Sequence, residues 1–398
     1  MLDIAKLVRQ MPEIGQQMQK DAQAGLKRLE IAQKLFLQAN QEQDKLIQAQ
    51  EIWGDRMIFT PGIPIESLDT AIEIPEAPSS HSVFSSDGSQ IAPSHHEIIY
   101  CYLINIGRIM LHYGQNLHPL LDSIPEIYYK TEDLYSAKKW GIRTEEWMGY
   151  HRTMKEVQIL TEMACTWVNP PGAHFNIPNL AMTDGSLTYW FLDTLPTDAK
   201  EEILNPIIES LQQLQASKIP IVGYISASRS IDAISFLRLM ACPYEVPHCT
   251  NFCSMDNEKN PCQKMEPLRD TSLWQQILQP RQRSAIFRSN SRILDCYPES
   301  QKTHFCYLHG GAEVARVEFP QWVAEDSELL NQALSITLTQ IDKGFGYPVA
   351  LAEAHNLAVV KGGDRTQFFS LIEEQMLRYG VKNVAVSYKE ARKRGSIA

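Results

Sequence analysis

The chain has 398 residues, and its 44% hydrophobic content is enough to bury a core of ordinary size in one large domain or two smaller ones, which excludes a disordered chain. No apolar run reaches the roughly eighteen residues of a membrane-spanning helix, and the start, MLDIAKLVRQMPEIGQQMQ, lacks the features of a secretory signal, so we expect a soluble protein of the cytoplasm with no membrane partner. The net charge of −10 excludes a globally basic nucleic-acid binder but is compatible with a local basic groove.

The first 60 residues are predicted to form a helical arm. Residues 13–56 are rich in Gln, Lys, Ala, Leu and Glu, with apolar side chains at helical spacing, which predicts one long helix or a helical hairpin. Such an arm either lies on its own domain or forms a coiled coil with a second copy, and the irregular heptads favour the first interpretation. Residues 61–82 are rich in Pro and Ser and are interpreted as an extended linker.

From residue 83 to about residue 385 the pattern predicts a folded domain in which strands alternate with helices. Alternation of this kind favours a mixed α/β sheet covered by helices. The expected strands span residues 97–107, 177–183, 219–226, 303–308 and 312–319. The expected helices span residues 143–167, 199–216, 230–240, 325–342 and 364–379, with a further helix after Gly346-Tyr347-Pro348.

Two Asp-Gly-Ser motifs, at residues 87–89 and 184–186, are the most informative local feature. Each follows an apolar stretch, so Asp87 and Asp184 are expected at or just beyond the end of a strand, where glycine lets the chain turn. One interpretation is ordinary turn chemistry. The other is a site for a hard divalent cation, since two such aspartates and an acid on the intervening helix would bring oxygen ligands together from separate elements.

The helix between the motifs offers Glu156 and Glu162 as the third acid. Six residues turn a helix by about 600°, so the two side chains point in different directions and only one of them is expected to face the aspartates. Arg152 precedes Glu156 by four residues, so the alternative interpretation of Glu156 is a surface ion pair worth under about 1 kcal/mol.

The segment that follows Gly346 is the third feature that suggests chemistry. Pro348 suits the start of a helix, on which Leu351 and His355 share a face, with Tyr347 just before the start. His355 is interpreted either as a core residue or as a metal ligand or proton donor, because imidazole titrates near neutral pH.

Taken in order, these segments resemble the NurA nuclease family over about residues 80–380. Each motif is weak alone, and the ordered set is specific. The segments that carry the resemblance are Phe84-Ser85-Ser86-Asp87-Gly88-Ser89, Arg152 with Glu156, Leu180-Ala181-Met182-Thr183-Asp184-Gly185-Ser186-Leu187, Val222-Gly223-Tyr224-Ile225-Ser226, Gly346-Tyr347-Pro348 through Glu353-Ala354-His355, and Asp364-Arg365.

The resemblance implies an RNase H-like mixed sheet flanked by helices and a nuclease that depends on Mn²⁺ or Mg²⁺. It further implies 5′→3′ exonuclease and single-strand endonuclease activity, a homodimeric ring, and a hexameric HerA-type ATPase as partner in processing DNA double-strand breaks. Carried over by position, Asp87 and Asp184 match the aspartates of the family's motifs, and Tyr347 and His355 match its carboxyl-terminal tyrosine and histidine. As the glutamate we prefer Glu156, with Glu162 as the alternative.

Residues 243–272 are a polar, proline-containing insertion that the family's minimal pattern lacks. In and beside it lie Cys242, Cys249, Cys253 and Cys262, four of the chain's eight cysteines, together with His248. The spacing contains no Cys-x-x-Cys pair of the kind usual in zinc ribbons. The cysteines are interpreted either as free thiols in a loop or as ligands of zinc or an iron–sulfur cluster.

Basic residues gather in two places along the chain. Arg281, Arg283, Arg288 and Arg292 form the first cluster, and residues 386–398 form a basic tail. The plain interpretation is a solvated face, and for a nuclease the first cluster is predicted to contact DNA phosphates.

Two hypotheses of different classes follow. In the first, Asp87, Glu156 and Asp184 hold the metal of a phosphodiester hydrolase, His355 ligates metal or protonates the leaving oxygen, and Tyr347 positions the phosphate. In the second, the chain is a non-catalytic scaffold on the same fold for a DNA-translocating ATPase. The intact acidic positions favour the enzyme.

Overall fold

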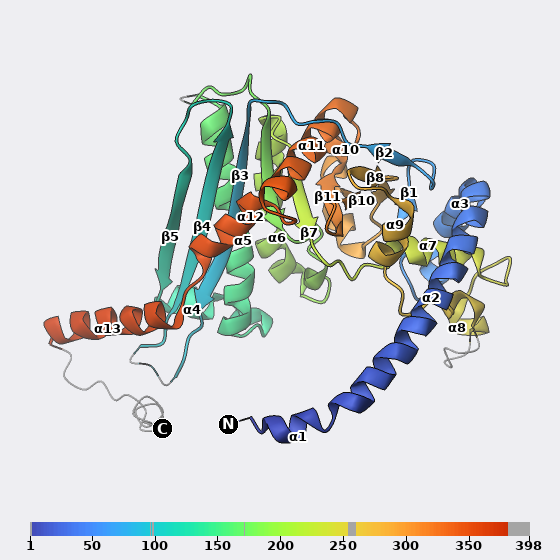
Figure 1. The fold of residues 1–398 in the computed structure, drawn as a ribbon. Coiled ribbons are helices and arrows are strands. Elements are labelled where there is room, and N and C mark those ends of the chain that lie inside the picture. Colours follow the sequence, from blue (N-terminus) through green and yellow to red (C-terminus); the bar gives the residue numbers. More distant parts are fainter. Residues whose placement is uncertain (1, 96, 98, 171, 254–259, 381–398) are drawn as a thin grey trace.

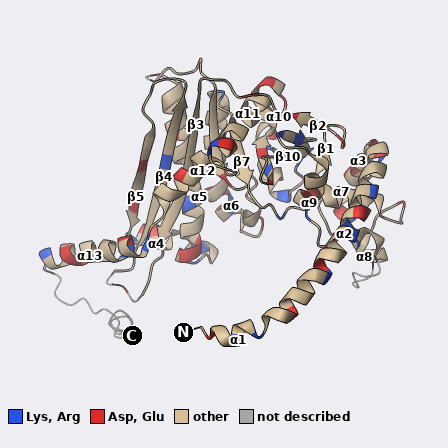
Figure 2. Ribbon diagram, in the orientation of Figure 1, with Lys and Arg blue, Asp and Glu red and all other residues tan. Residues whose placement is uncertain are grey.

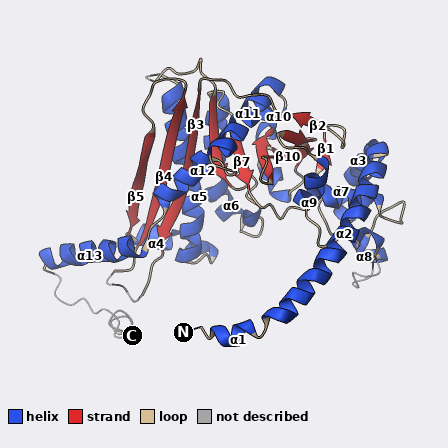
Figure 3. Cartoon of the chain, viewed as in Figure 1, coloured by secondary structure: helices blue, strands red, loops and turns tan. Residues whose placement is uncertain are grey.

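The computed structural model describes residues 2–95, 97, 99–170, 172–253 and 260–380, and it centres on one mixed sheet of eleven strands (Figure 1). Helices lie on both faces of this sheet (Figure 3). The strands are β1 (Ile63–Pro64), β2 (Ala71–Glu73), β3 (His81–Ile91), β4 (Tyr102–Tyr113), β5 (Leu120–Tyr128), β6 (Asn179–Asp184), β7 (Ile221–Ile225), β8 (Gln282–Ser284), β9 (Phe287–Arg288), β10 (Thr303–His309) and β11 (Val314–Pro320).

The helices flank the sheet and extend beyond it at the amino end. The α-helices are α1 (Ile4–Val8), α2 (Met11–Gln41), α3 (Gln43–Trp53), α4 (Thr131–Tyr135), α5 (Thr144–Val168), α6 (Thr197–Ala216), α7 (Asp232–Met240), α8 (Cys249–Phe252), α9 (Asp270–Ile277), α10 (Gln321–Ala324), α11 (Ser327–Lys343), α12 (Val349–Ala358) and α13 (Gly362–Arg378). Short 3₁₀ helices are η1 (Gly54–Arg56), η2 (Ser136–Trp140), η3 (Trp190–Leu192), η5 (Pro261–Gln263), η6 (Arg292–Cys296) and η7 (Glu299–Gln301).

The sheet mixes antiparallel and parallel pairing. Its main path is β1-β9-β10-β11-β7-β6-β3-β4-β5, with β8 joining β10 to β2. Strands β3, β4 and β5 are antiparallel neighbours, whereas β3, β6 and β7 run parallel, and α5 and α6 occur in the connections between these parallel strands. The expected mixed sheet flanked by helices is therefore confirmed.

Strand β3 lies at the centre of two cores, because its side chains alternate between the faces of the sheet. Phe84 belongs to the core on the side of α5 and α6, and Val83 belongs to the core on the side of α11 and α12. Strand β6 does the same with Ala181 and Met182. The two strands that carry the Asp-Gly-Ser motifs are thus fixed from both sides.

The amino-terminal arm is a long helix, α2, followed by a shorter one, α3, after a break at Glu42. Residues 2–23 are exposed, whereas Ala32, Phe36 and Ala39 pack against the body of the protein. The segment 61–82, interpreted as a linker, contains β1, β2 and the first residues of β3; β1 and β2 lie at the edge of the sheet, and most of the segment is irregular.

Several expected elements differ in detail. The strand expected at 97–107 begins at Tyr102 and runs to Tyr113, and the edge strand β5 was not expected. Pro125 lies within β5, and proline is tolerated only at such sheet edges. The basic tail 386–398 and residues 254–259 of the cysteine insertion lie outside the described residues. Among the helices described, none is long and apolar enough to span a membrane.

Candidate active site

Asp87 and Asp184 lie at the same level on neighbouring parallel strands. Ser85 of β3 pairs with Met182 of β6, and each aspartate follows two residues later. Because side chains alternate along a strand, both carboxylates point to the face that α12 covers. Asp184 ends β6, as predicted, but Asp87 lies inside β3 opposite Gly107, so the expected strand end at residue 87 is wrong.

Glu156 of α5 reaches the same region from the other face of the sheet. Its carboxylate lies against Gly88, where a Cβ atom would stand only 2.4 Å from Glu156 Oε1 and 2.7 Å from Arg152 Cγ. Arg152 Nε is 3.1 Å from the same Oε1. Ser86 donates a hydrogen bond of 2.7 Å to the Glu156 carbonyl and holds the helix on the strand. The glycine of the first motif therefore provides space for a carboxylate, and the expected turn is absent.

The three carboxylates are close enough to affect one another. Burial raises the pKa of the Glu156 carboxyl to about 8, and Asp87 and Asp184 add to the rise while Arg152 opposes it. Asp184 is exposed as a residue, but loss of water around its carboxyl raises its pKa, with a further contribution from Asp87. Such a concentration of negative charge favours a proton or a bound cation.

Helix α12 supplies His355, and the turn just before the helix supplies Tyr347. His355 Nδ1 is 2.7 Å from Asp87 Oδ2, and the Tyr347 hydroxyl hydrogen-bonds with Asp184. Burial, reinforced by Asp184, raises the pKa of Tyr347 and keeps its hydroxyl protonated. The helix approaches closely because Gly107 has no side chain: a Cβ there would lie 2.4 Å from the Ala354 carbonyl oxygen.

The serine of each motif anchors a neighbouring element. Ser89 donates to the Ala358 carbonyl and accepts a 3.1 Å hydrogen bond from the Val360 amide, so it fixes the carboxyl end of α12. Ser186 donates a 2.7 Å hydrogen bond to Glu318 Oε2 on β11. The Leu187 amide donates to the same oxygen at 2.9 Å, so Glu318 holds the loop that follows Asp184.

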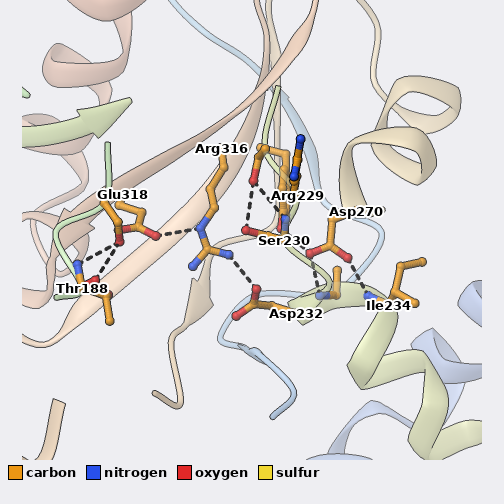
Figure 4. Close-up of polar contacts among 12 residues, drawn as sticks. Thr188, Arg229, Ser230, Asp232, Ile234, Asp270, Arg316 and Glu318 are labelled. Carbon is orange, nitrogen blue, oxygen red and sulfur yellow. Dashed lines mark hydrogen bonds and ion pairs between the residues drawn. The ribbon is translucent and has the colours of Figure 1, made fainter. Parts of the chain in front are cut away.

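Glu318 belongs to a buried charge network (Figure 4). Arg316 Nε is 2.7 Å from Glu318 Oε1, and Arg316 Nη1 is 3.0 Å from Asp232 Oδ2 at the start of α7. Asp270 accepts hydrogen bonds from the Ala233 and Ile234 amides of the same helix end. Sequence reasoning missed this network, although the charged pair at 316 and 318, two apart in an otherwise apolar strand, was a signal for it.

Glu162 lies away from the aspartates. Its side chain lines a hollow with Arg108, Leu120 and Trp167 beside β4. The structure therefore brings Asp87, Glu156, Asp184, Tyr347 and His355 together and leaves Glu162 elsewhere, which favours Glu156 among the two alternatives.

The donor set fits a hard divalent cation, because carboxylate oxygens from three elements converge. Within the described ranges, no group of three or more His, Cys, Asp and Glu side chains is arranged as a metal site. Each carboxylate instead faces a donor of the protein: Asp87 faces His355, Glu156 faces Arg152, and Asp184 faces Tyr347. A metal at this site would compete with these donors for the carboxylate oxygens.

The arginines predicted to contact DNA fall into two groups. Arg283 is 5% exposed and forms two hydrogen bonds with Glu66, at 2.6 and 2.9 Å, so it is a structural residue and we correct its assignment. Arg281 pairs with Asp342 at 2.9 Å on the surface. Arg288 and Arg292 remain accessible to a phosphate. In Figure 2, basic and acidic positions are interspersed along the ribbon.

Residues 81–360 match the NurA domain family. The chain belongs to the NurA family. Its structure is similar to the crystal structure of the NurA nuclease from Sulfolobus solfataricus, with a TM-score of 0.52 and 12% identity over 95% of this chain and 98% of that chain. At this identity the likeness shows a shared fold. A comparison with curated proteins gives no match.

Both findings confirm the resemblance stated from the sequence, and the predicted fold class with it. Together, the family and the fold support a nuclease. The matched segment contains Asp87, Glu156, Asp184, Tyr347 and His355 and also includes the cysteine insertion.

Proposed function

We propose that this NurA family member is a metal-dependent DNA nuclease whose Mn²⁺ or Mg²⁺ is held by Asp87, Glu156 and Asp184. The observation that carries the proposal is the convergence of these carboxylates from β3, α5 and β6 on one end of a parallel strand pair. A bound divalent cation would activate water and stabilise the leaving oxygen of a phosphodiester. The activity we expect is 5′→3′ exonuclease with single-strand endonuclease cleavage.

His355 has a geometry suited to holding a proton at the leaving oxygen or to joining the metal ligands. Its side chain is 62% exposed, while its Nδ1 atom faces the Asp87 carboxylate at 2.7 Å. Because Nδ1 is engaged with Asp87, Nε2 is the ring nitrogen available for a further ligand. Asp87 thereby orients the imidazole, as carboxylates commonly do for functional histidines.

Tyr347 is suited to positioning the scissile phosphate. Its hydroxyl stays protonated and is hydrogen-bonded to Asp184, and its ring packs edge-on against Tyr224, with the centroids 5.7 Å apart. The hydroxyl has a single proton, which it donates to Asp184 here; with Asp184 engaged by a metal, that proton would be available to a phosphate oxygen, and the neutral group adds no charge to an acidic site. Arg152, beside Glu156, offers a positive charge for the same purpose.

Partners follow from the family resemblance. We propose a homodimer and a hexameric HerA-type ATPase, which together process DNA ends in the cytoplasm. The exposed amino-terminal helices support this: Met11, Ile14 and Met18 stand on a helix with few contacts to the body and are 44–66% exposed. Deletion of residues 2–23 should therefore weaken assembly, measured by light scattering and by co-purification with the ATPase, and leave cleavage by the isolated subunit intact.

The test of catalysis uses linear DNA labelled at its 5′ or 3′ end, single- or double-stranded, with Mn²⁺, with Mg²⁺ or with EDTA. Asp87→Asn, Asp184→Asn and Glu156→Gln should each lower cleavage at least about 100-fold, the scale of losing one stabilising group in the transition state. Glu162→Gln is the matched control and should cleave at nearly the parental rate. Binding of Mn²⁺ by calorimetry should weaken in the first three variants only.

Two results would contradict the proposal. Parental cleavage by folded Asp87→Asn or Asp184→Asn would refute the metal site. Absence of cleavage by the wild-type protein on every substrate and with either metal, combined with retained binding to the ATPase, would favour the non-catalytic scaffold.

A further inference from the structure

Four cysteines of the insertion converge on one cavity, although the chain separates them by up to twenty positions. The cavity has a volume of about 80 Å³, more than one water molecule needs. Its lining includes the four thiol residues, which are Cys242, Cys249, Cys253 and Cys262. The remaining cysteines of the chain lie in other elements.

The four thiols come from separate short elements around the cavity. Cys242 follows the end of α7, Cys249 begins α8, Cys253 directly follows α8, and Cys262 lies in η5. Backbone hydrogen bonds here include local ones, such as those from the Cys253 amide to the Cys249 carbonyl and from the Lys264 amide to the Pro261 carbonyl, and a metal held by the thiols would add a link between the elements.

The thiols are near enough to influence one another. Burial raises the pKa of Cys242, Cys253 and Cys262, and at least one other thiol of the set adds to the rise in each case. Each pair of thiols among the four cysteines interacts electrostatically in this way. Such mutual repulsion between thiolates disappears when a cation binds them.

Two further groups face the cavity. Arg238 lines it and lowers the pKa of Cys262 through a hydrogen bond and its charge, against the larger effect of burial. His248 also lines it, and its buried Nδ1 atom has no hydrogen-bond partner among the residues that the structure describes. Arg238 also pairs with Glu266 at 2.8 Å, so its positive charge is shared between that carboxylate and the thiols, and the imidazole nitrogen offers a further ligand.

From this convergence we infer that Cys242, Cys249, Cys253 and Cys262 bind a thiophilic metal centre, either a zinc ion or an iron–sulfur cluster. The centre is separate from the carboxylate site: Figure 1 shows α8 at the right-hand side of the molecule and α12 across the middle of the sheet. The described residues hold no preassembled group of three or more ligands, so the site forms as each thiol turns about its single side-chain bond into the cavity. Each thiol loses its proton on binding, and zinc, or iron with sulfide, takes the place of those protons.

The consequence is structural. The centre would tie the end of α7 to α8 and η5, beside a second hollow that α3 lines with Leu46 and Ala49. It would therefore stabilise the part of the body on which the amino-terminal arm rests. Cleavage of DNA would not depend on it.

The experiment starts from the full chain purified without oxygen and without metal-binding affinity tags. Plasma mass spectrometry for zinc and iron, an assay for acid-labile sulfide, and visible absorption distinguish the two centres. We expect about one zinc ion per chain, or about four iron atoms with a similar amount of sulfide. Neither metal near these ratios, before and after anaerobic reconstitution with Zn²⁺ or with Fe²⁺ and sulfide, would overturn the inference.

Variants locate the centre. Cys249→Ser and Cys253→Ser should each lose most of the bound metal, whereas Cys296→Ser, an exposed cysteine outside the cavity, should retain it. Retention of the full metal content by the double variant Cys249→Ser/Cys253→Ser would also overturn the inference. If that variant is insoluble, titration of the wild type with a chelator replaces it: metal loss should speed proteolysis of residues 243–272 before the sheet unfolds, and unchanged proteolysis refutes the role. DNA cleavage is measured in parallel and should persist, so the outcome is independent of the proposed nuclease site.

Discussion

Replacing Gly88 by alanine tests whether Glu156 can take its position against β3 only because Gly88 has no side chain. The added methyl would stand 2.4 Å from Glu156 Oε1 and 2.7 Å from Arg152 Cγ. Ordinary contact begins at about 3.4 Å, so the carboxylate must move by about 1 Å. Both neighbours are side chains of α5, so a small rotation or shift of these groups relieves the contact without disrupting the sheet.

The magnitude follows from this displacement. Misplacing a reacting or ligating group by about 1 Å costs on the order of 100-fold in rate, so Gly88→Ala should lower cleavage by about that factor. The free energy of unfolding should change less, by about 1–3 kcal/mol, as for other overpacked sites. The loss of activity should therefore greatly exceed the loss of folded protein at assay temperature.

The assay compares initial rates of cleavage of end-labelled DNA with urea unfolding of the same preparations. Gly149→Ala is the matched control, because Gly149 lies on the same helix as Glu156 and a Cβ there would meet nothing within 4 Å. That change should leave cleavage unaltered and stabilise the helix by up to about 1 kcal/mol.

A double-mutant cycle decides whether Gly88 acts through the glutamate. In a Glu156→Gln background, Gly88→Ala should cause little further loss, because the group that it displaces is already impaired. A full additional 100-fold loss in that background would refute the positioning role. Parental activity of Gly88→Ala itself would show that Glu156 tolerates the shift and is no metal ligand.

Three further predictions concern stability. Glu318→Gln breaks a buried ion pair and should lower the free energy of unfolding in urea by about 3–5 kcal/mol. It should also lower the rate of DNA cleavage, because Glu318 holds the loop that contains Ser186, and an unchanged unfolding midpoint would contradict the prediction. Arg283→Met should cost about 3 kcal/mol because Glu66 would lose its buried partner, with DNA affinity unchanged in a binding titration, whereas a loss of affinity alone would restore its predicted phosphate contact. Burial lowers the pKa of His151 to about 4, so between pH 6.5 and 4 the unfolded chain binds the proton more readily than the folded one, and stability falls as the pH is lowered. This fall should be about 2–3 kcal/mol smaller in His151→Gln, and equal pH profiles would argue against it.

Helical periodicity in the sequence was sufficient to place the helices of the core. Helices α5, α6 and α11 begin and end within about two residues of their predicted limits, since apolar spacing marks them, with Asn169 after α5, Pro196 before α6 and Gly344 after α11. Short strands were harder: β8 and β9 span two or three residues and depend on pairing with β10 for their existence. Tertiary pairing of that kind leaves little local signal.

In the candidate site, too, local geometry could be predicted from the sequence, whereas contacts that depend on tertiary packing could not. Helical geometry predicted that Glu156 and Glu162 point to different sides, and the structure agrees, but the sequence could not say which side faces the aspartates. The contact between His355 and Asp87 joins residues 268 positions apart, so it depends on the docking of α12 against Gly107. The signal for that docking, a glycine within an apolar strand, has several interpretations before the fold is known.

The glycine and serine of the two Asp-Gly-Ser motifs have different structural roles. Gly185 has φ +119°, a conformation that residues with a side chain rarely adopt, whereas Gly88 stays in the extended strand and provides space for Glu156. Their serines tie the strands to different partners, the end of α12 and Glu318. The turn interpretation therefore holds for the second motif and fails for the first. What the two motifs share is an aspartate at the same level on adjacent strands, followed by a glycine and a serine that fit the neighbouring elements around it.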